Sequence, residues 1–295
     1  MKAAMAGLLA FSVVAVAPTV VQRAAEARSP LRLTENGETL KYGQDPLQSL
    51  DFYPAQAAEA PAPLVLFVHG GGWTRGSKDN ATGQYKADHY TAAGYNFATI
   101  DYRLVPEATV EQQAQDVADA LAHLLTRAPG LHLDPNRVVL MGHSAGAHLV
   151  SLVGTDPQYL ENAGLSPDDI SGIIPLDGAA YDVARQMEAN RVPLLAKRYD
   201  DAFGTDPARQ RALSPTLQSA APNVGQWLIL HVDREDGRQQ SESLAAALNR
   251  GGSRAQVQAI DGRGLRGHAQ INRQLGDPDY TATPIVDAWL ARIFG

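Results

Sequence analysis

The chain alternates short, continuously apolar runs with longer amphipathic stretches. Residues 64–68 combine branched and aromatic side chains without a polar position, which predicts a strand buried on both faces. Further strands are expected at residues 48–53, 96–100, 138–141, 170–176, 227–232 and 256–260.

The stretches between these runs have helical periodicity. Residues 111–125 place four apolar side chains three or four positions apart, on one helix face: Ala114, Val117, Leu121 and Leu124. Further helices are expected at residues 241–248 and 284–294. This alternation predicts the α/β class, with a mostly parallel central sheet and helices on both of its faces.

Residues 181–218 do not fit this alternation of strand-like and helical segments. They are rich in Arg, Asp and Ala and contain three prolines. Long segments of this kind are either functional or simply irregular, so the insertion predicts a short cap over a site or a long surface connection.

Composition narrows the class of protein. The chain has 295 residues, 44% of them hydrophobic and 19% charged, which is enough apolar material for one large buried core. A net charge of −7 without a basic run argues against a nucleic-acid or anionic-membrane partner. The absence of cysteine excludes a thiol nucleophile, a disulfide framework and a Cys-type zinc site.

The N-terminus has the pattern of an export signal. Lys2 precedes an apolar stretch over residues 3–17, and residues 25–27 (Ala-Glu-Ala) have the spacing that signal peptidase cleaves. We therefore expect a signal peptide over residues 1–27 and a single mature domain over residues 28–295, periplasmic or secreted and without stable membrane association. The alternative is an uncleaved anchor, because apolar character persists to Val21.

A nucleophile motif lies between a predicted strand and a predicted helix. Residues 142–146 read Gly-His-Ser-Ala-Gly and match G-x-S-x-G. A sharp turn at this point exposes the hydroxyl of Ser144 and requires minimal side chains two residues to either side. We expect Ser144 to be a catalytic nucleophile; the alternative is a glycine-rich turn that merely contains a serine.

A glycine-rich loop follows the strand predicted at residues 64–68. Residues 69–73 read His-Gly-Gly-Gly-Trp, and glycines allow backbone N–H groups to point into a pocket. The N–H groups of Gly70 or Gly71, with that of Ala145, are expected to form an oxyanion hole. Trp73 is expected to line the pocket, with a core position as the alternative.

The acid and the base should follow late strands, in the order Ser, Asp or Glu, His. Three carboxylates follow the strand predicted at residues 227–232: Asp233, Glu235 and Asp236. We favour Asp236, which lies deepest in that segment, and the choice among the three stays open.

The base is expected to be His268, which lies beyond the last predicted strand. His143 is placed too early in the chain and is expected to line the substrate pocket, with a packing role as the alternative. His268 would take the proton of Ser144, and Asp236 would orient the imidazole. This chemistry requires no metal and no organic cofactor.

With these motifs, the chain resembles the esterase/lipase group of α/β-hydrolases, especially its kynurenine formamidase-like and feruloyl esterase-like branch. The resemblance covers about residue 47 to the C-terminus and rests on residues 69–73, 101–104, 142–149 and 267–268. It implies that Asp101, Tyr102 and Arg103 are framework residues. Val232 departs from the pattern, because a glycine commonly follows the preceding histidine, which leaves the acid in doubt.

The resemblance implies hydrolysis of carboxylic esters. Aryl formamides or amides are alternative substrates for the same triad, and a non-catalytic protein that binds small molecules is the alternative from another class. Small acyl groups are favoured because residues 181–218 are too short for an extended lid. The sequence does not predict the oligomeric state.

Overall fold

The computed structural model describes residues 37–295 except 57, 59 and 190–192. The predicted signal peptide, residues 1–27, lies outside the described residues. Within the described part of the chain, no helix has both the length and the apolar character needed to cross a membrane.

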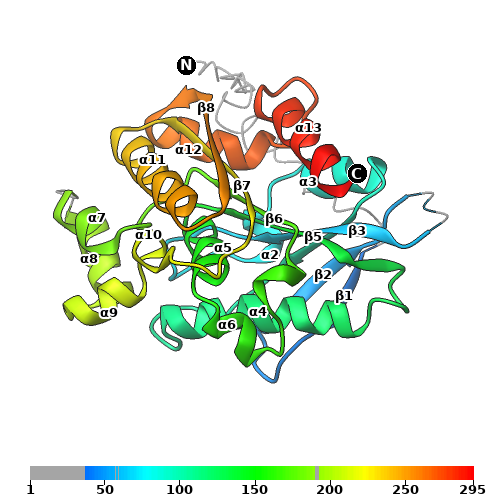
Figure 1. The fold of residues 1–295 in the computed structure, drawn as a ribbon, viewed down its shortest axis with the longest axis horizontal. Coiled ribbons are helices and arrows are strands. Elements are labelled where there is room, and N and C mark those ends of the chain that lie inside the picture. Colours follow the sequence, from blue (N-terminus) through cyan, green and yellow to red (C-terminus); the bar gives the residue numbers. More distant parts are fainter. Residues whose placement is uncertain (1–36, 57, 59, 190–192) are drawn as a thin grey trace, which may run out of the picture. The chain divides into compact units, whose positions relative to one another are not determined.

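An eight-stranded sheet forms the centre of the domain (Figure 1). Its strands, in chain order, are β1 (Glu38–Lys41), β2 (Ser49–Tyr53), β3 (Ala62–Val68), β4 (Asn96–Ile100), β5 (Leu133–His143), β6 (Gly172–Leu176), β7 (Gln226–Asp233) and β8 (Arg254–Arg263). In space they follow the order β1-β2-β4-β3-β5-β6-β7-β8. The contacts β1–β2 and β2–β4 are antiparallel, and all others are parallel.

Helices surround the sheet and fill most connections. They are α2 (Lys78–Ala81), α3 (Lys86–Ala92), α4 (Val110–Thr126), α5 (Ala145–Thr155), α6 (Gln158–Asn162), a short 3-10 turn (Pro167–Asp169), α7 (Val183–Ala189), α8 (Pro193–Phe203), α9 (Pro207–Ala212), α10 (Pro215–Gln218), α11 (Glu235–Arg250), α12 (Gly264–Gln274) and α13 (Ala282–Phe294). Figure 1 shows α4 and α6 on one side of the sheet and α3 and α13 on the other.

The alternation of side chains along β3 explains why this strand is apolar throughout. Leu64 and Leu66 belong to one hydrophobic cluster, which includes residues of α4, α5 and α11. Val65 and Phe67 belong to a second cluster on the opposite face, with residues of α3, α12 and α13. Both faces of the strand are covered, so neither tolerates a polar position.

The predicted α/β class is confirmed, and each of the seven expected strands is present. The largest differences lie at element boundaries. The strand expected at residues 138–141 extends over eleven residues as β5, and the helix expected at 241–248 begins six residues earlier as α11. β1 was not expected, because only Leu40 within it is buried and no apolar run marks it.

The insertion over residues 181–218 contains four short helices, α7 to α10. Three of its prolines, which suggested irregular structure, stand at the first residue of α8, α9 and α10. Proline is tolerated there because its missing N–H would have no partner within the helix. Arg209 of α9 binds Glu111 of α4 through two hydrogen bonds of 2.7 and 2.8 Å and so ties this insertion to the body of the domain.

His148 provides a second tie between the insertion and the core. It lies in α5, fully buried, and its Nε2 is 2.8 Å from the carbonyl oxygen of Leu213 in the insertion. Its Nδ1 accepts a hydrogen bond of 3.3 Å from Nε1 of Trp73. Because Nδ1 must accept and Nε2 must donate, the structure requires the neutral tautomer protonated on Nε2.

Burial lowers the pKa of His148 from 6.5 to about 4, against a smaller opposing effect of the bond to Leu213. The unfolded chain takes up a proton on this side chain as the pH falls through 6.5, whereas the folded chain does so only near pH 4. The associated stability is therefore complete above pH 6.5 and is lost as the pH falls toward 4.

We predict that replacing His148 with glutamine weakens this pH dependence. From pH 7 to pH 5, the wild type should lose about 2 kcal/mol more unfolding free energy than His148→Gln, as the pKa difference requires. Urea unfolding of both proteins at the two pH values measures the difference. An identical loss in both proteins would contradict the neutral, doubly bonded state of His148.

Candidate active site

Ser144 stands at a sharp turn between β5 and α5. Its backbone has φ 55° and ψ −116°, in a region that side-chain-bearing residues rarely occupy. A side chain at Gly142 would collide with the backbone of Gly146, and one at Gly146 would collide with the carbonyl oxygen of Val68. The two glycines of the motif are therefore required for close packing of the turn.

His268 lies within hydrogen-bond distance of this serine. Its Nε2 is 3.0 Å from Oγ of Ser144. The sequence placed His268 in a glycine-rich loop, whereas the structure places it in α12, directly after the end of β8. The position of the histidine in the fold is as expected, but it is held by a helix.

The carboxylate that contacts His268 belongs to Asp177, at the end of β6. Its Oδ2 is 2.6 Å from Nδ1 of His268, and its Oδ1 accepts a 3.0 Å hydrogen bond from the backbone N–H of Val232. The Asp177 side chain is fully buried, and Nε of Arg234 lies 3.3 Å from Oδ2. A buried carboxylate is thus held by a backbone donor, an imidazole and a guanidinium charge.

The structure does not bring Asp236, the favoured acid, to His268. Asp236 is 41% exposed and lies 3.8 Å from Arg234, with Gln186 donating to its Oδ2. Neither alternative takes its place: Glu235 pairs with Arg238, and Asp233 pairs with Arg263.

The physical reason for this difference is the early start of α11. β7 ends at Asp233 and α11 begins at Glu235, so no loop remains in which Asp236 could turn back toward the histidine. Asp177 was overlooked, although it follows the buried strand β6 directly and β6 lies beside β5, which ends at the nucleophile. Val232, the departure from the family pattern, had put the choice among the three carboxylates in doubt.

The glycine loop after β3 lies against the nucleophile. A β-carbon placed on Gly70 would lie 3.0 Å from the Cβ of Ser144. Gly71 and Gly72 have φ values of 142° and 62°, which glycine adopts readily. Ala145 is the first residue of α5, and its N–H therefore has no acceptor within that helix. The loop and the helix start are thus adjacent to Ser144, as expected for Gly70, Gly71 and Ala145.

The framework residues Asp101, Tyr102 and Arg103 hold this part of the structure in place through hydrogen bonds and an ion pair. The hydroxyl of Tyr102 donates a 2.9 Å hydrogen bond to the carbonyl oxygen of His69, whose ring stacks on that of Tyr102. Oδ1 of Asp101 accepts from the backbone N–H of Lys78, and Arg103 forms a forked ion pair with buried Asp116. These contacts agree with the structural role that the resemblance implied.

Trp73 occupies the core rather than an open pocket wall. It is 3% exposed and packs edge-on against Phe203 of α8, with Tyr199 of the same helix beside it. Its indole N–H donates a hydrogen bond to Nδ1 of His148. Of the two roles considered for Trp73, the structure favours packing beneath the insertion.

His143 contacts the backbone and the ring of His268. Its Nε2 donates a 2.9 Å hydrogen bond to the backbone carbonyl of His268, and the two rings are 4.6 Å apart. Burial, followed by the nearby charge of His268, lowers the pKa of His143 well below its usual value. A neutral His143 can therefore position His268 without placing a second positive charge beside it.

Lys86 anchors the helix that carries the base. Its side chain is fully buried, and Nζ donates to the carbonyl oxygens of Thr82 and Asn272 and to Oδ1 of Asn272. Asn272 lies one helical turn after His268, on the same face of α12. This contact fixes α12 relative to α3, and with it the position of His268.

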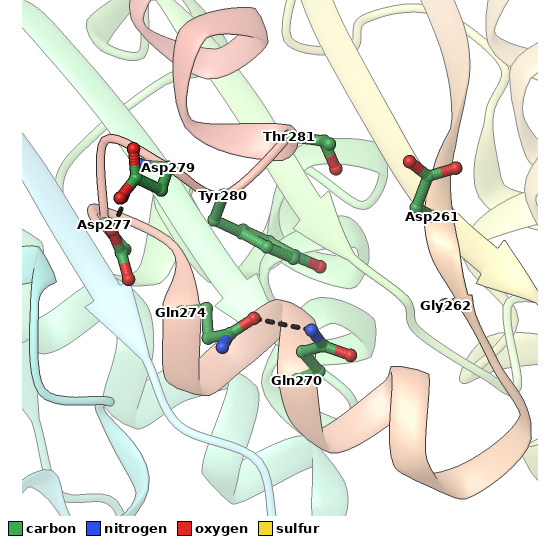
Figure 2. Close-up of a pocket in the computed structure, with 8 residues that line it drawn as sticks. All are labelled: Asp261, Gly262, Gln270, Gln274, Asp277, Asp279, Tyr280 and Thr281. Atoms are coloured by element: carbon green, nitrogen blue, oxygen red, sulfur yellow. Dashed lines mark hydrogen bonds between the residues drawn. The ribbon is translucent and has the colours of Figure 1, made fainter.

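A separate cavity of about 300 Å³ lies on the other side of α12 (Figure 2). Gln270 and Gln274 of that helix line it, together with three aspartates: Asp261, Asp277 and Asp279. Oδ1 of Asp277 accepts a hydrogen bond from the backbone N–H of Asp279, so these two residues form a local turn. Across the described residues, no group of three or more His, Cys, Asp or Glu side chains is arranged to hold a metal ion.

Comparison with known proteins agrees with this architecture. A family model described as BD-FAE matches residues 50–178. Esterase LipC of Mycobacterium tuberculosis is 30% identical over 206 residues, covering 66% of this chain and 50% of that protein. Kynurenine formamidase of Danio rerio is 25% identical over 256 residues, covering 86% of this chain and 82% of that protein.

The fold is also that of a solved esterase. Esterase B of Lactobacillus rhamnosis superimposes with a TM-score of 0.71 at 24% identity, covering 93% of this chain and 91% of that one. The chain spans half or less of the length of several curated relatives, among them the mycobacterial esterase and plant isoprenylcysteine methylesterases. The sheet order and the structural similarity show the α/β-hydrolase fold, and the chain is similar in sequence to an esterase and to a kynurenine formamidase.

Proposed function

We propose that this protein hydrolyses small carboxylic esters through an acyl-enzyme on Ser144, with His268 as the base and Asp177 as the acid. One observation carries the proposal: Asp177, His268 and Ser144 form a continuous chain of hydrogen bonds of 2.6 and 3.0 Å. This is the arrangement of a nucleophile, a base and an orienting carboxylate.

The proposed first step is acylation. Oγ of Ser144 attacks the ester carbonyl and its proton moves to Nε2 of His268, while Asp177 stabilises the imidazolium through Nδ1–H. The carbonyl oxygen becomes an oxyanion, which the N–H groups of Gly70 or Gly71 and of Ala145 would bind. When the intermediate collapses, the bond to the alcohol breaks and His268 returns the proton to the leaving oxygen.

The second step reverses these roles with water. His268 takes a proton from a water molecule, whose oxygen attacks the acyl carbon. Collapse of this second intermediate breaks the bond to Oγ, releases the carboxylic acid and restores the serine proton from His268. Arg234 lies 3.3 Å from the Asp177 carboxylate and places a positive charge beside it.

The same residues could cleave an aryl formamide. The similarity to the Danio rerio kynurenine formamidase extends over 86% of this chain and favours this second candidate over other amides. A purely binding function has less support, because such a protein would not need the serine, the histidine and the carboxylate to be aligned.

We predict that Ser144→Ala abolishes ester hydrolysis without unfolding the protein. The wild type and the variant would be assayed with p-nitrophenyl acetate, butyrate and octanoate, beside an aryl formamide. Loss of the nucleophile should lower kcat by roughly 10³-fold or more. The wild type should hydrolyse the acetate or the butyrate faster than the octanoate, and a clear preference for octanoate would contradict the assignment of small acyl groups. Faster cleavage of the aryl formamide than of the esters would favour the second candidate function.

We predict that the two aspartates respond differently to the same substitution. Asp177→Asn should lower kcat by roughly 10³- to 10⁴-fold, because an amide cannot hold the imidazole in the required tautomer. Asp236→Asn is the matched control and should change kcat by less than about threefold, since Asp236 is half-exposed and contacts Arg234 and Gln186.

Steady-state kinetics at one pH, with thermal unfolding of both proteins, make this comparison. A large loss in Asp236→Asn and a small one in Asp177→Asn would reverse the assignment of the acid.

We also propose that the protein is exported, with cleavage after Ala27, on the strength of the pattern at its N-terminus. Expression of the full chain in a bacterium, followed by mass analysis of each fraction, tests this. The proposal requires a periplasmic or secreted species that begins at Arg28. A full-length protein confined to the membrane fraction would support the anchor instead.

A further inference from the structure

We propose that Arg198 forms an anion-binding subsite beside the catalytic centre, which selects esters that carry a carboxylate on the acyl chain. The inference rests on the proposed esterase function and adds the class of substrate. It follows from the position of Arg198, from the cavity that it lines and from the charges around it.

Arg198 lies over the loop that would bind the oxyanion. It belongs to α8, and its side chain crosses Gly72 so closely that a β-carbon there would collide with its Cδ and lie 3.1 Å from Nε. Gly70, at the other end of the same three glycines, contacts Ser144. Two residues span at most about 7 Å, so the loop positions next to Arg198 and next to Ser144 are no farther apart than that.

A cavity of about 550 Å³ opens at this position. Its lining consists of Thr74, Val105, Pro106, Lys197, Arg198 and Asp201. Thr74 continues the glycine loop, and α8 supplies the three charged residues. The cavity therefore lies between Thr74, two residues after the last glycine of the loop, and the charged face of α8, with apolar walls from Val105 and Pro106.

Among the described residues, one cation of this cavity forms no ion pair. Lys197 forms an ion pair with Asp201, with Nζ 2.6 Å from the carboxylate, and is 72% exposed. Arg198 is half-buried and forms no ion pair with any residue that the structure describes. A guanidinium binds a carboxylate through two parallel hydrogen bonds, which makes a carboxylate its best-matched ligand.

Half-esters of short dicarboxylic acids have the required shape. In the monoester of a four- or five-carbon diacid, two or three methylene groups separate the reacting carbonyl from the free carboxylate. Such a chain places the carbonyl at Ser144 while the carboxylate reaches toward Arg198. A neutral ester of the same length cannot make the charged contact with Arg198 and makes only apolar contacts with Val105 and Pro106.

The test compares monomethyl glutarate with methyl pentanoate, which differ by a carboxylate in place of a methyl group. Wild type, Arg198→Gln, Arg198→Lys and Lys197→Gln would be assayed by pH-stat titration. The measured quantity is the ratio of kcat/KM for the half-ester to kcat/KM for the neutral ester. Lys197→Gln is the matched control, because it removes the same charge from the neighbouring residue.

We expect the ratio to fall roughly tenfold in Arg198→Gln, mainly through the KM of the half-ester, and to recover in part in Arg198→Lys. In Lys197→Gln it should stay within about twofold, because Lys197 is exposed and already paired. Added salt should lower the ratio of the wild type more than that of Arg198→Gln.

Two results would overturn the subsite. One is an unchanged ratio in Arg198→Gln with unfolding temperatures equal to the wild type, and the other is an equal fall in Lys197→Gln. Turnover of methyl pentanoate without a preference for the half-ester would refute the subsite alone. No turnover of any ester by the folded wild type would refute the esterase function itself.

Discussion

The hydrogen bond between Asp177 and His268 is the contact on which the site depends. Asp177 is fixed at the end of β6, and His268 is carried by α12, 91 residues later in the chain. The bond is only useful if the sheet order places β6 next to β5, where Ser144 ends the strand. A buried carboxylate requires such partners, since without them its charge would be strongly unfavourable inside the domain.

Several contacts outside the chain of three residues serve to keep His268 in place. Lys86 and His143 hold α12 and the His268 backbone from two sides, through Asn272 and the His268 carbonyl. The imidazole is thereby restricted to the position from which it reaches both Asp177 and Ser144. Precise positioning of this kind accounts for a large part of what an active site contributes to catalysis.

The sequence predicted the class of fold, and its local patterns singled out Ser144 and His268, which the structure brings within hydrogen-bond distance. Ser144 lies in a motif whose strand, turn and helix are adjacent in the chain, and His268 follows the last strand. Which carboxylate contacts His268 depends on which strands are neighbours in the sheet, and this is not a local property. Asp177 is separated from Ser144 by the whole of α5 and α6, so its proximity to the site follows only from the strand order.

Packing in three dimensions also decided the roles of Trp73 and His143. Both flank motif residues, for which the sequence left a pocket wall or a packing role open, and the structure covers Trp73 with α8 and His143 with α12. The same packing of α8 brings Arg198 over Gly72, although 126 residues separate them in the chain. The contacts of the inserted helices could not be read from a segment with so little periodicity.

The most direct test of the account is covalent labelling of the protein with a fluorophosphonate, which reacts with an activated serine. The account predicts a mass increase of one adduct per chain, located on Ser144 by peptide mapping, and much slower labelling of Asp177→Asn. A folded protein that takes up no adduct, or that carries it on another residue, would contradict the central claim that Asp177 and His268 activate Ser144.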